Sequence, residues 1–203
     1  TTASNNTAVG YNALLSNTTG QQNVAVGYAA LDANTTNGYM TAVGYQALGA
    51  NTTGEYSVAI GRQALLSNTT GTRHVAIGAE ALETCTTGSY CVAVGFKALE
   101  SNNGSSSCAV GYQALLDQTT GASNAAVGFE AMRENTTGGD NNAFGYQALY
   151  SNTTGSSNTA IGHKCLTNNT TADYNTAVGR YCMGVNTTGT RNTGMAPFAL
   201  DAN

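Results

Sequence analysis

A glycine that recurs at a regular interval along the whole chain is the feature that most constrains how it folds. Eleven glycines follow Ala-Val, Ala-Ile or Ala-Phe, and successive sequence numbers differ by 17 in nine cases and by 16 in one. They are Gly10, Gly27, Gly44, Gly61, Gly78, Gly95, Gly111, Gly128, Gly145, Gly162 and Gly179. A twelfth, degenerate copy carries Ala196 at this position. A fixed internal period indicates a stack of repeated units, so the repeat decides the fold class.

Each position of the repeat forms a column, numbered here from the glycine as position 0. Column −2 is Ala in eleven copies, and column −1 is apolar in all twelve. Column +3 is Ala in ten copies, column +4 is Leu or Met in all twelve, and column +7 is Asn in ten. The first members of the glycine, Val, Leu and Asn columns are Gly10, Gly27, Gly44, Val9, Val26, Val43, Leu14, Leu31, Leu48, Asn17, Asn34 and Asn51.

These columns predict an all-β parallel solenoid of about twelve coils. A helix needs about 10 residues of 3.6-residue periodicity, and no stretch between the glycines offers them. We expect a first strand over residues 23–27, a second short strand centred on Ala30 and Leu31, and a turn over residues 34–38, where Asn and Gly tolerate left-handed backbone. One coil cannot bury its own Val and Leu, so neighbouring coils must cover them.

Side-chain alternation along the first strand divides the columns between two faces. We expect Val at −1 to contribute to the core together with Leu at +4. Ala at −2 and Gly at 0 then lie on the opposite face, where small side chains permit the close approach of another backbone. This arrangement predicts self-association along the Ala and Gly face.

The two ends of the sequence suggest one continuous array. The last residues lead through an ordinary turn into the first ones, and the interval from Ala196 across this join to Gly10 equals the regular spacing of the repeat. Solenoids protect their terminal coils with atypical polar caps, and neither end has that character. We therefore expect residues 1–203 to be a single solenoid that is a segment of a longer array.

The repeat resembles a known family. The motif Asn-x-Ala-Val-Gly-Tyr-x-Ala-Leu, present from Asn6 to Leu14 and with Phe for Val from Asn141 to Leu149, is similar to head repeats of trimeric autotransporter adhesins. Similar repeats occur in bacteriophage tail fibres. The resemblance implies a left-handed parallel β-roll, three chains around one axis, and a surface-exposed or virion-attached role. The 17-residue period is longer than the commonest head repeat of that family.

Composition and motifs argue against several other functions. Only 9% of the residues are charged and the net charge is −4, so no basic field exists to hold nucleic acid. No apolar run approaches the ~18 residues of a membrane helix, so we expect no membrane insertion. The two histidines, His74 and His163, occupy different columns about five coils apart, and no catalytic set or phosphate-binding loop is apparent. We predict no enzymatic activity, no cofactor and no metal site.

The Asn-Thr-Thr triplets permit three interpretations. Each contains an Asn-x-Thr sequon, which in secreted chains can accept a glycan. The favoured interpretation is structural, with Asn forming an amide ladder and Thr supplying turn hydrogen bonds. An ice-binding threonine array is a remote alternative, because adjacent strand residues would point to opposite faces. The sequons begin at Asn17, Asn34, Asn51, Asn68, Asn135, Asn152, Asn169 and Asn186.

Several side chains should stack in successive coils. Column −5 places Tyr39, Tyr56, Arg73 and Tyr90 one above another, as an aromatic column with one cation in it, and column +1 does the same for Tyr11, Tyr28, Tyr45 and Arg62. Such columns either stiffen the rod or grip a surface glycan, and we favour stiffening. Among charged residues, we expect Glu80 and Lys97 to form an ion pair, and Glu83 and Glu100 to stack as like charges that face water. Two pairs of cysteines are disulfide candidates, although free thiols are favoured for both: Cys165 with Cys182, and Cys85 with Cys91.

The predicted function is that of an extracellular or virion-attached structural fibre, built from stacked coils that self-associate as a trimer or a bundle. The alternative is an adhesin that recognises a surface glycan or a protein receptor.

Overall fold

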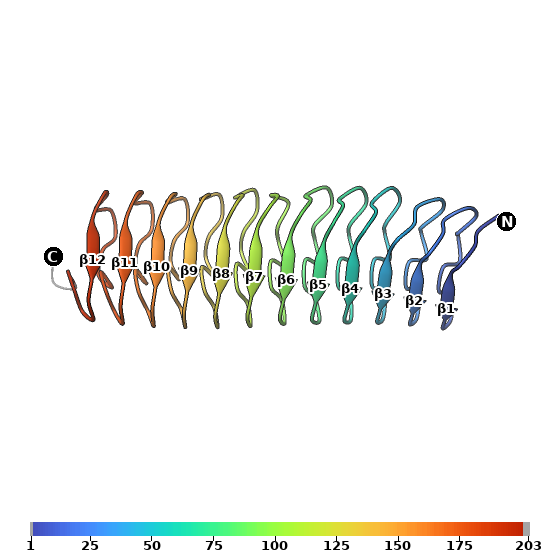
Figure 1. Cartoon of the computed structure of the whole chain (residues 1–203), viewed down its shortest axis with the longest axis horizontal. Coiled ribbons are helices and arrows are strands. Elements are labelled where there is room, and N and C mark those ends of the chain that lie inside the picture. Colours follow the sequence, from blue (N-terminus) through green and yellow to red (C-terminus); the bar gives the residue numbers. More distant parts are fainter. Residues whose placement is uncertain (1, 201–203) are drawn as a thin grey trace.

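The computed structural model describes residues 2–200 of the chain, and over these residues it is a parallel β-solenoid without helices (Figure 1). Twelve strands of three residues each form one sheet in chain order. Their bounds are β1 (Thr7–Val9), β2 (Val24–Val26), β3 (Thr41–Val43), β4 (Val58–Ile60), β5 (Val75–Ile77), β6 (Val92–Val94), β7 (Cys108–Val110), β8 (Ala125–Val127), β9 (Asn142–Phe144), β10 (Thr159–Ile161), β11 (Thr176–Val178) and β12 (Thr193–Met195).

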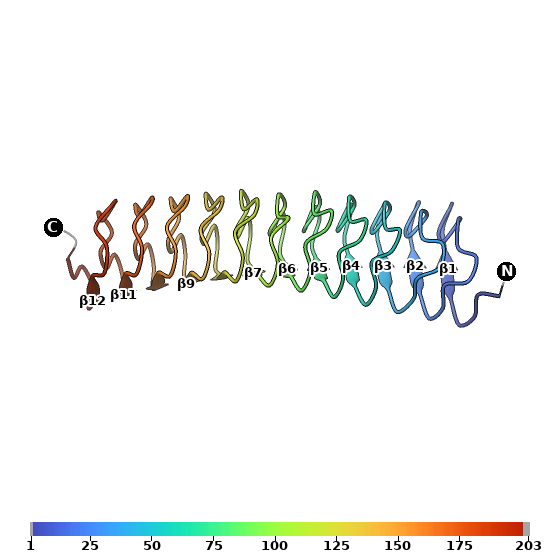
Figure 2. The same ribbon diagram turned by 90° about the horizontal axis from the view of Figure 1, so that it is seen from above.

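The strands pair in strict register, so the columns of the sequence are physical columns in the molecule. Ala25 pairs with Ala42, its counterpart in the next coil, and Val94 pairs with Val110 across the one shortened spacing. In Figure 2 the coils follow one another in a row, with the two termini at opposite ends. The prediction of an all-β parallel solenoid with a 17-residue spacing is confirmed.

The predicted second strand around Ala30 and Leu31 is wrong. Residues 28–33 form a turn, in which Ala29 and Leu31 both have a left-handed φ of 51°. A strand requires negative φ throughout, so an extended segment cannot form here. The coils remain hydrogen-bonded in this region, since the Leu31 amide donates to the Ala47 carbonyl at 3.1 Å.

Left-handed backbone is a regular property of every coil. Columns −5, +2 and +4 have φ between 48° and 63° in all twelve copies, although none of these residues is glycine. Val, Ile and Thr are especially strained at positive φ, and none of them occurs in these three columns, although Thr is abundant elsewhere in the chain. The sequence therefore encodes the turns by excluding β-branched residues.

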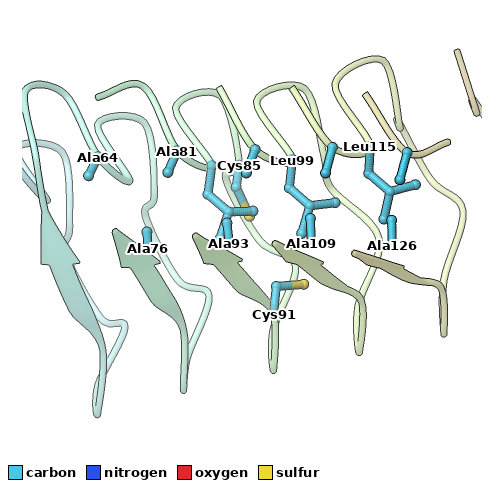
Figure 3. Close-up of a cluster of buried hydrophobic side chains, with 14 of the residues drawn as sticks. Ala64, Ala76, Ala81, Cys85, Cys91, Ala93, Leu99, Ala109, Leu115 and Ala126 are labelled. Atoms are coloured by element: carbon cyan, nitrogen blue, oxygen red, sulfur yellow. The ribbon is translucent and has the colours of Figure 1, made fainter. Parts of the chain in front are cut away.

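The core assignment predicted for the strand is inverted. Ala at −2 is the buried strand residue from β2 to β11, whereas Val9, Val26 and Val43 at −1 point outward, Val9 being 57% exposed. Leu at +4 and Ala at +3 fill the interior together with Ala at −2, as Figure 3 shows for Leu99, Ala81 and Ala93. The predicted self-association along the Ala and Gly face is therefore also wrong, because that face is the inside of the coil.

Space explains the inversion. The alternation of side chains along the strand places Val and Ala on opposite faces but does not determine which of the two faces the interior. Hydrophobicity alone would favour Val as the interior residue. A 17-residue coil is narrow, and one Leu per coil already occupies its interior, so only Ala fits on the inner strand face. Packing at the strand end is equally close: Gly44 has a φ of +137°, and a Cβ built on it would overlap the carbonyl oxygen of Gly61.

A side chain compensates for the missing residue of the shortened coil. In a regular coil the Thr69 carbonyl accepts bonds from both the amide and the hydroxyl of Thr52, each at 3.0 Å. In the short coil the Asn103 Oδ1 accepts from the amide and the hydroxyl of Thr86, each at 2.8 Å. The amide group of Asn103 thus replaces a peptide carbonyl, and the stack continues without a break.

Candidate interaction surface

The first and third residues of β1–β12, which form columns −3 and −1, make an outward-facing surface that we call the outer strand face. Its residues are half-buried or exposed, as the 39% exposure of Ile60 and the 41% exposure of Phe144 show. No Asp, Glu, Lys, Arg or Pro occurs at any of these twenty-four positions. All seven basic and eleven acidic residues of the chain lie in other columns.

Such a face is unusual for a surface that meets only water. Parallel sheets are normally covered on both sides, and contiguous exposed apolar patches mark interaction sites. The inner side of this sheet is covered by its own coils. The outer side is covered by nothing within residues 2–200, since Val, Ile, Phe144 and Met195 in column −1 keep a solvent-exposed surface.

A column of aromatic rings borders the outer strand face at position +1. Tyr11, Tyr28 and Tyr45 stack with ring centroids 5.5 and 5.3 Å apart. A second, longer run follows, with neighbouring centroids 5.0–5.6 Å apart, through Phe96, Tyr112, Phe129, Tyr146 and His163. The sequence prediction for column +1 covered only the first run, although the second run occupies the same column of the repeat.

Column −5 is formed as its register predicts. Tyr39 and Tyr56 stack at 5.0 Å, and the Arg73 guanidinium lies 5.4 Å from the Tyr56 ring and 5.5 Å from the Tyr90 ring. These rings lie face to face along the rod axis. Their flat surfaces therefore cover one another, and the column presents ring edges and hydroxyl groups to solvent.

Charged side chains gather beside the turn that carries Glu80. Lys97 Nζ lies 3.2 Å from Glu80 and 2.9 Å from Glu100, and Arg62 also pairs with Glu80. The carboxylates of Glu80, Glu83 and Glu100 have oxygens within 4.8 Å of one another. The Arg62 guanidinium and the Lys97 ammonium offset two of these three negative charges through ion pairs with Glu80 and Glu100, whereas Glu83 forms no ion pair within residues 2–200.

Column +7 is a ladder of amide groups inside the stack. Asn152 Nδ2 donates to Asn135 Oδ1 at 2.8 Å and to the Gly155 carbonyl at 2.9 Å, and Asn152 Oδ1 accepts from Asn169 Nδ2 at 3.0 Å. The ladder is interrupted at Cys85, which has no amide to donate. The buried sequon asparagines are Asn34, Asn51, Asn68, Asn135, Asn152 and Asn169, whereas Asn17 and Asn186 are half-buried.

Burial bears on which sequons could carry a glycan. A sugar on Asn152 would take the amide nitrogen out of the interior and break both bonds that it donates. Three further sequons, at Asn5, Asn103 and Asn168, have exposed side chains and were not considered in the sequence analysis. A search for every Asn-x-Ser or Asn-x-Thr, including those outside column +7, would have found them.

The threonine pairs lie in a turn and not in a strand, so the expectation that they point to opposite faces is wrong. Thr35 and Thr36 are both outside the core, Thr35 being exposed. In most pairs the hydroxyl of the first threonine is used within the stack, as in the bond from Thr18 Oγ1 to the Thr35 carbonyl at 3.0 Å. Within residues 2–200, the hydroxyl of the second threonine donates no hydrogen bond inside the stack, so these hydroxyls form one column outside the core.

All five cysteines are free thiols in the structure, and four of them are buried. Burial raises the pKa of Cys85 to about 12, and it raises the pKa of Cys165 to about 12 as well. Neither candidate pair is joined, in line with the favoured assignment of free thiols. Cys165 Sγ donates to the Ala177 carbonyl at 3.1 Å, which places it as a small core side chain.

The two histidines occupy unlike environments. His74 is buried, with Nε2 2.7 Å from the Gly88 carbonyl and Nδ1 3.3 Å from the Cys91 amide nitrogen that donates to it. Burial lowers the pKa of His74, although its two backbone hydrogen bonds act in the opposite direction. His163 lies at the surface and stacks on Tyr146.

Comparisons with protein-family models, with curated proteins and with solved structures found no match to this chain. Within the part of the chain that the structure describes, no helix is long and apolar enough to cross a membrane.

Proposed function

We propose that this chain is a segment of a structural fibre located outside the cell or on a virion, in which copies pack side by side through the outer strand face. The observation that carries the proposal is the absence of charge from all twenty-four outward strand positions of an exposed sheet. Sheet surfaces that stay in contact with water usually carry some charged side chains, because these oppose aggregation. The absence of charge here therefore favours contact with another copy of the chain.

The dimensions of the face suit an interface between copies. Twelve strands about 4.8 Å apart make it roughly 55 Å long, and three residues per strand make it about 10 Å wide. The strand residues alone therefore offer about 550 Å², and the bordering rings of column +1 enlarge this area toward the ~800 Å² per partner of a specific interface.

A parallel, in-register arrangement fits the face best. When copies are related by rotation about an axis parallel to the rod, equivalent residues lie at the same height. A bulky residue such as Phe144 then makes the same contact at every interface between copies. Three chains is the number that the resemblance to trimeric autotransporter adhesins implies. The extracellular or virion-attached location rests on the same resemblance.

An adhesin is the alternative, and the exposed Tyr39–Tyr90 column favours it as a contact surface. Sugars bind aromatic residues through the flat faces of the rings. In this column the rings cover each other, so only the outermost faces of the column are free. The column is therefore better suited to stiffening the rod than to gripping a glycan along its length.

Charge introduced on the outer strand face tests the proposal. We expect the wild-type chain to sediment as an assembly, and the Val110→Asp/Val127→Asp variant to sediment as a 20.6 kDa monomer. The matched control is Thr120→Asp/Thr137→Asp, which adds the same charges to turns of the same two coils and should leave assembly intact. A monomeric wild-type chain at micromolar concentration would contradict the proposal.

Cross-linking tests the parallel register. In a Cys108→Ala background, Val43→Cys places one thiol on β3, and parallel in-register copies bring these thiols to the same height. Mild oxidation should then give disulfide-linked dimers. In an antiparallel pair the new thiol would face β10 of its neighbour, so the absence of cross-linked dimers in assembled protein would refute the parallel arrangement.

A further inference from the structure

Tyrosine rings stack directly on other tyrosine rings in two places, both in the N-terminal part of the chain. Tyr11, Tyr28 and Tyr45 form one stack with centroid separations of 5.5 and 5.3 Å and interplanar angles of 16° and 13°. Tyr39 and Tyr56 form the other, with a separation of 5.0 Å and an angle of 12°. Each ring comes from a different coil, so every pair links two neighbouring coils.

The six remaining tyrosines have no tyrosine stacked on them among the described residues. Phe, Arg, His or small residues separate them, as Phe129 separates Tyr112 from Tyr146 and Arg73 precedes Tyr90. These six are Tyr90, Tyr112, Tyr146, Tyr150, Tyr174 and Tyr181. The chain thus contains tyrosines with and without a stacked tyrosine neighbour in a single molecule, which supplies an internal control.

The stacked rings are accessible. Tyr11 is 70% exposed and Tyr39 52%, and the other three lie between 47% and 48%. Small oxidants can therefore reach the ring edges, and the rings have room to turn about their side-chain bonds.

We propose that these two stacks are sites of oxidative cross-linking, in which dityrosine bonds join successive coils of one chain. The oxidant is a peroxide, acting through a haem peroxidase. Hydrogen peroxide takes one hydrogen atom from each of two phenols and is reduced to two molecules of water, leaving two phenoxyl radicals. The radicals couple through their ortho carbons, so one carbon–carbon bond forms. Each ortho hydrogen then leaves as a proton while its phenol oxygen regains one, which restores both aromatic rings.

The fold provides the proximity that this coupling needs. The solenoid register holds the two rings about one strand spacing apart, which makes their encounter intramolecular and raises their effective concentration. Only a rotation of exposed side chains separates the stacked arrangement from a bonded one, because the backbone already sets the coils at this distance. The product is a covalent staple along the rod axis.

This inference goes beyond the proposed fibre function and does not depend on it, because both partners of each bond belong to the same chain.

Peroxidase treatment of the 203-residue chain at low concentration tests the proposal. Residues 1–61 contain no Lys or Arg, so trypsin releases residues 1–62 as one fragment that carries all five stacked tyrosines. We expect dityrosine fluorescence, and this fragment should lose a pair of hydrogens for every bond formed. The fragments that carry the other six tyrosines should keep their mass.

Tyrosine-to-phenylalanine variants identify the bonded rings. Tyr28→Phe/Tyr56→Phe keeps both aromatic stacks but leaves no two tyrosines stacked on each other, so the fluorescence and the mass loss should disappear. Tyr112→Phe/Tyr146→Phe is the matched control and should behave as wild type. Persistence of the signal in the first variant, bonds that form only between chains, or mass loss spread over all tyrosine-containing fragments would each overturn the proposal.

Discussion

Replacing one rung of the amide ladder measures how much the ladder contributes to stability. The substitution is Asn152→Leu, chosen because Leu branches at Cγ as Asn does and fills a similar space. It removes the bonds from Asn152 Nδ2 to Asn135 Oδ1 and to the Gly155 carbonyl, and it removes the acceptor of Asn169 Nδ2.

The expected cost follows from what each former partner has left. The Gly155 carbonyl keeps its bond from Asn141 Nδ2 at 2.8 Å, and Asn169 Nδ2 keeps the Ala172 carbonyl at 3.1 Å. Asn135 Oδ1 loses its only donor and becomes a buried unpaired acceptor. Three hydrogen bonds at about 1 kcal/mol each, with the penalty for that acceptor partly offset by the burial of apolar Leu, give a loss of about 3 kcal/mol in the free energy of unfolding.

Urea unfolding followed by circular dichroism measures this loss, with all proteins at the same concentration. Asn168→Leu is the control, because Asn168 precedes the neighbouring rung and is exposed. It should change the free energy of unfolding by no more than about 0.5 kcal/mol. Equal, small effects at both positions would refute the claim that the buried amides hold the coils together.

Three further predictions concern single positions. Ser123 has a φ of 59°, so Ser123→Val should destabilise by about 1–2 kcal/mol while Ser123→Gly does not, and Thr137→Val, outside the left-handed columns, is the neutral control in the same urea assay. Burial lowers the pKa of His74 below its usual 6.5, so the unfolded chain binds the proton more tightly and stability should fall as pH drops below about 6.5. His74→Asn should flatten this dependence, and an unchanged dependence in that variant would contradict the assignment. With Ellman's reagent at pH 8, the native chain should expose no thiol except the half-buried Cys108, and reaction of two or more thiols before unfolding would contradict the buried positions of the other four.

The sequence is sufficient to predict the stack because a 17-residue period admits few architectures. The periodicity of Gly44 and its counterparts determines which residues lie above one another. The amide ladder, the ring columns and the Glu80–Lys97 pair are therefore predicted by adding the repeat length to a residue number. The pattern does not indicate which side chains point into the coil and which point outward. Val26 and Ala25 alternate whichever of them faces inward, and the volume inside one coil decides between them.

The failed prediction of a second strand has a similar origin. Ala30 and Leu31 are apolar and look like a short buried strand, yet the backbone at Leu31 is left-handed. The informative signal is a negative one, the exclusion of Val, Ile and Thr from three columns, and it becomes visible only when all copies are aligned. Functional surfaces were harder still to locate, because the outer strand face consists of residues that an alternation pattern would equally place in a core.

Cryo-electron microscopy of the native assembly tests the central claim most directly. We predict parallel rods with a strand spacing of about 4.8 Å along the axis, whose columns −3 and −1 are buried between chains and whose charged columns face solvent. Rods that meet through their charged turns, or single rods with the outer strand face open to water, would contradict it.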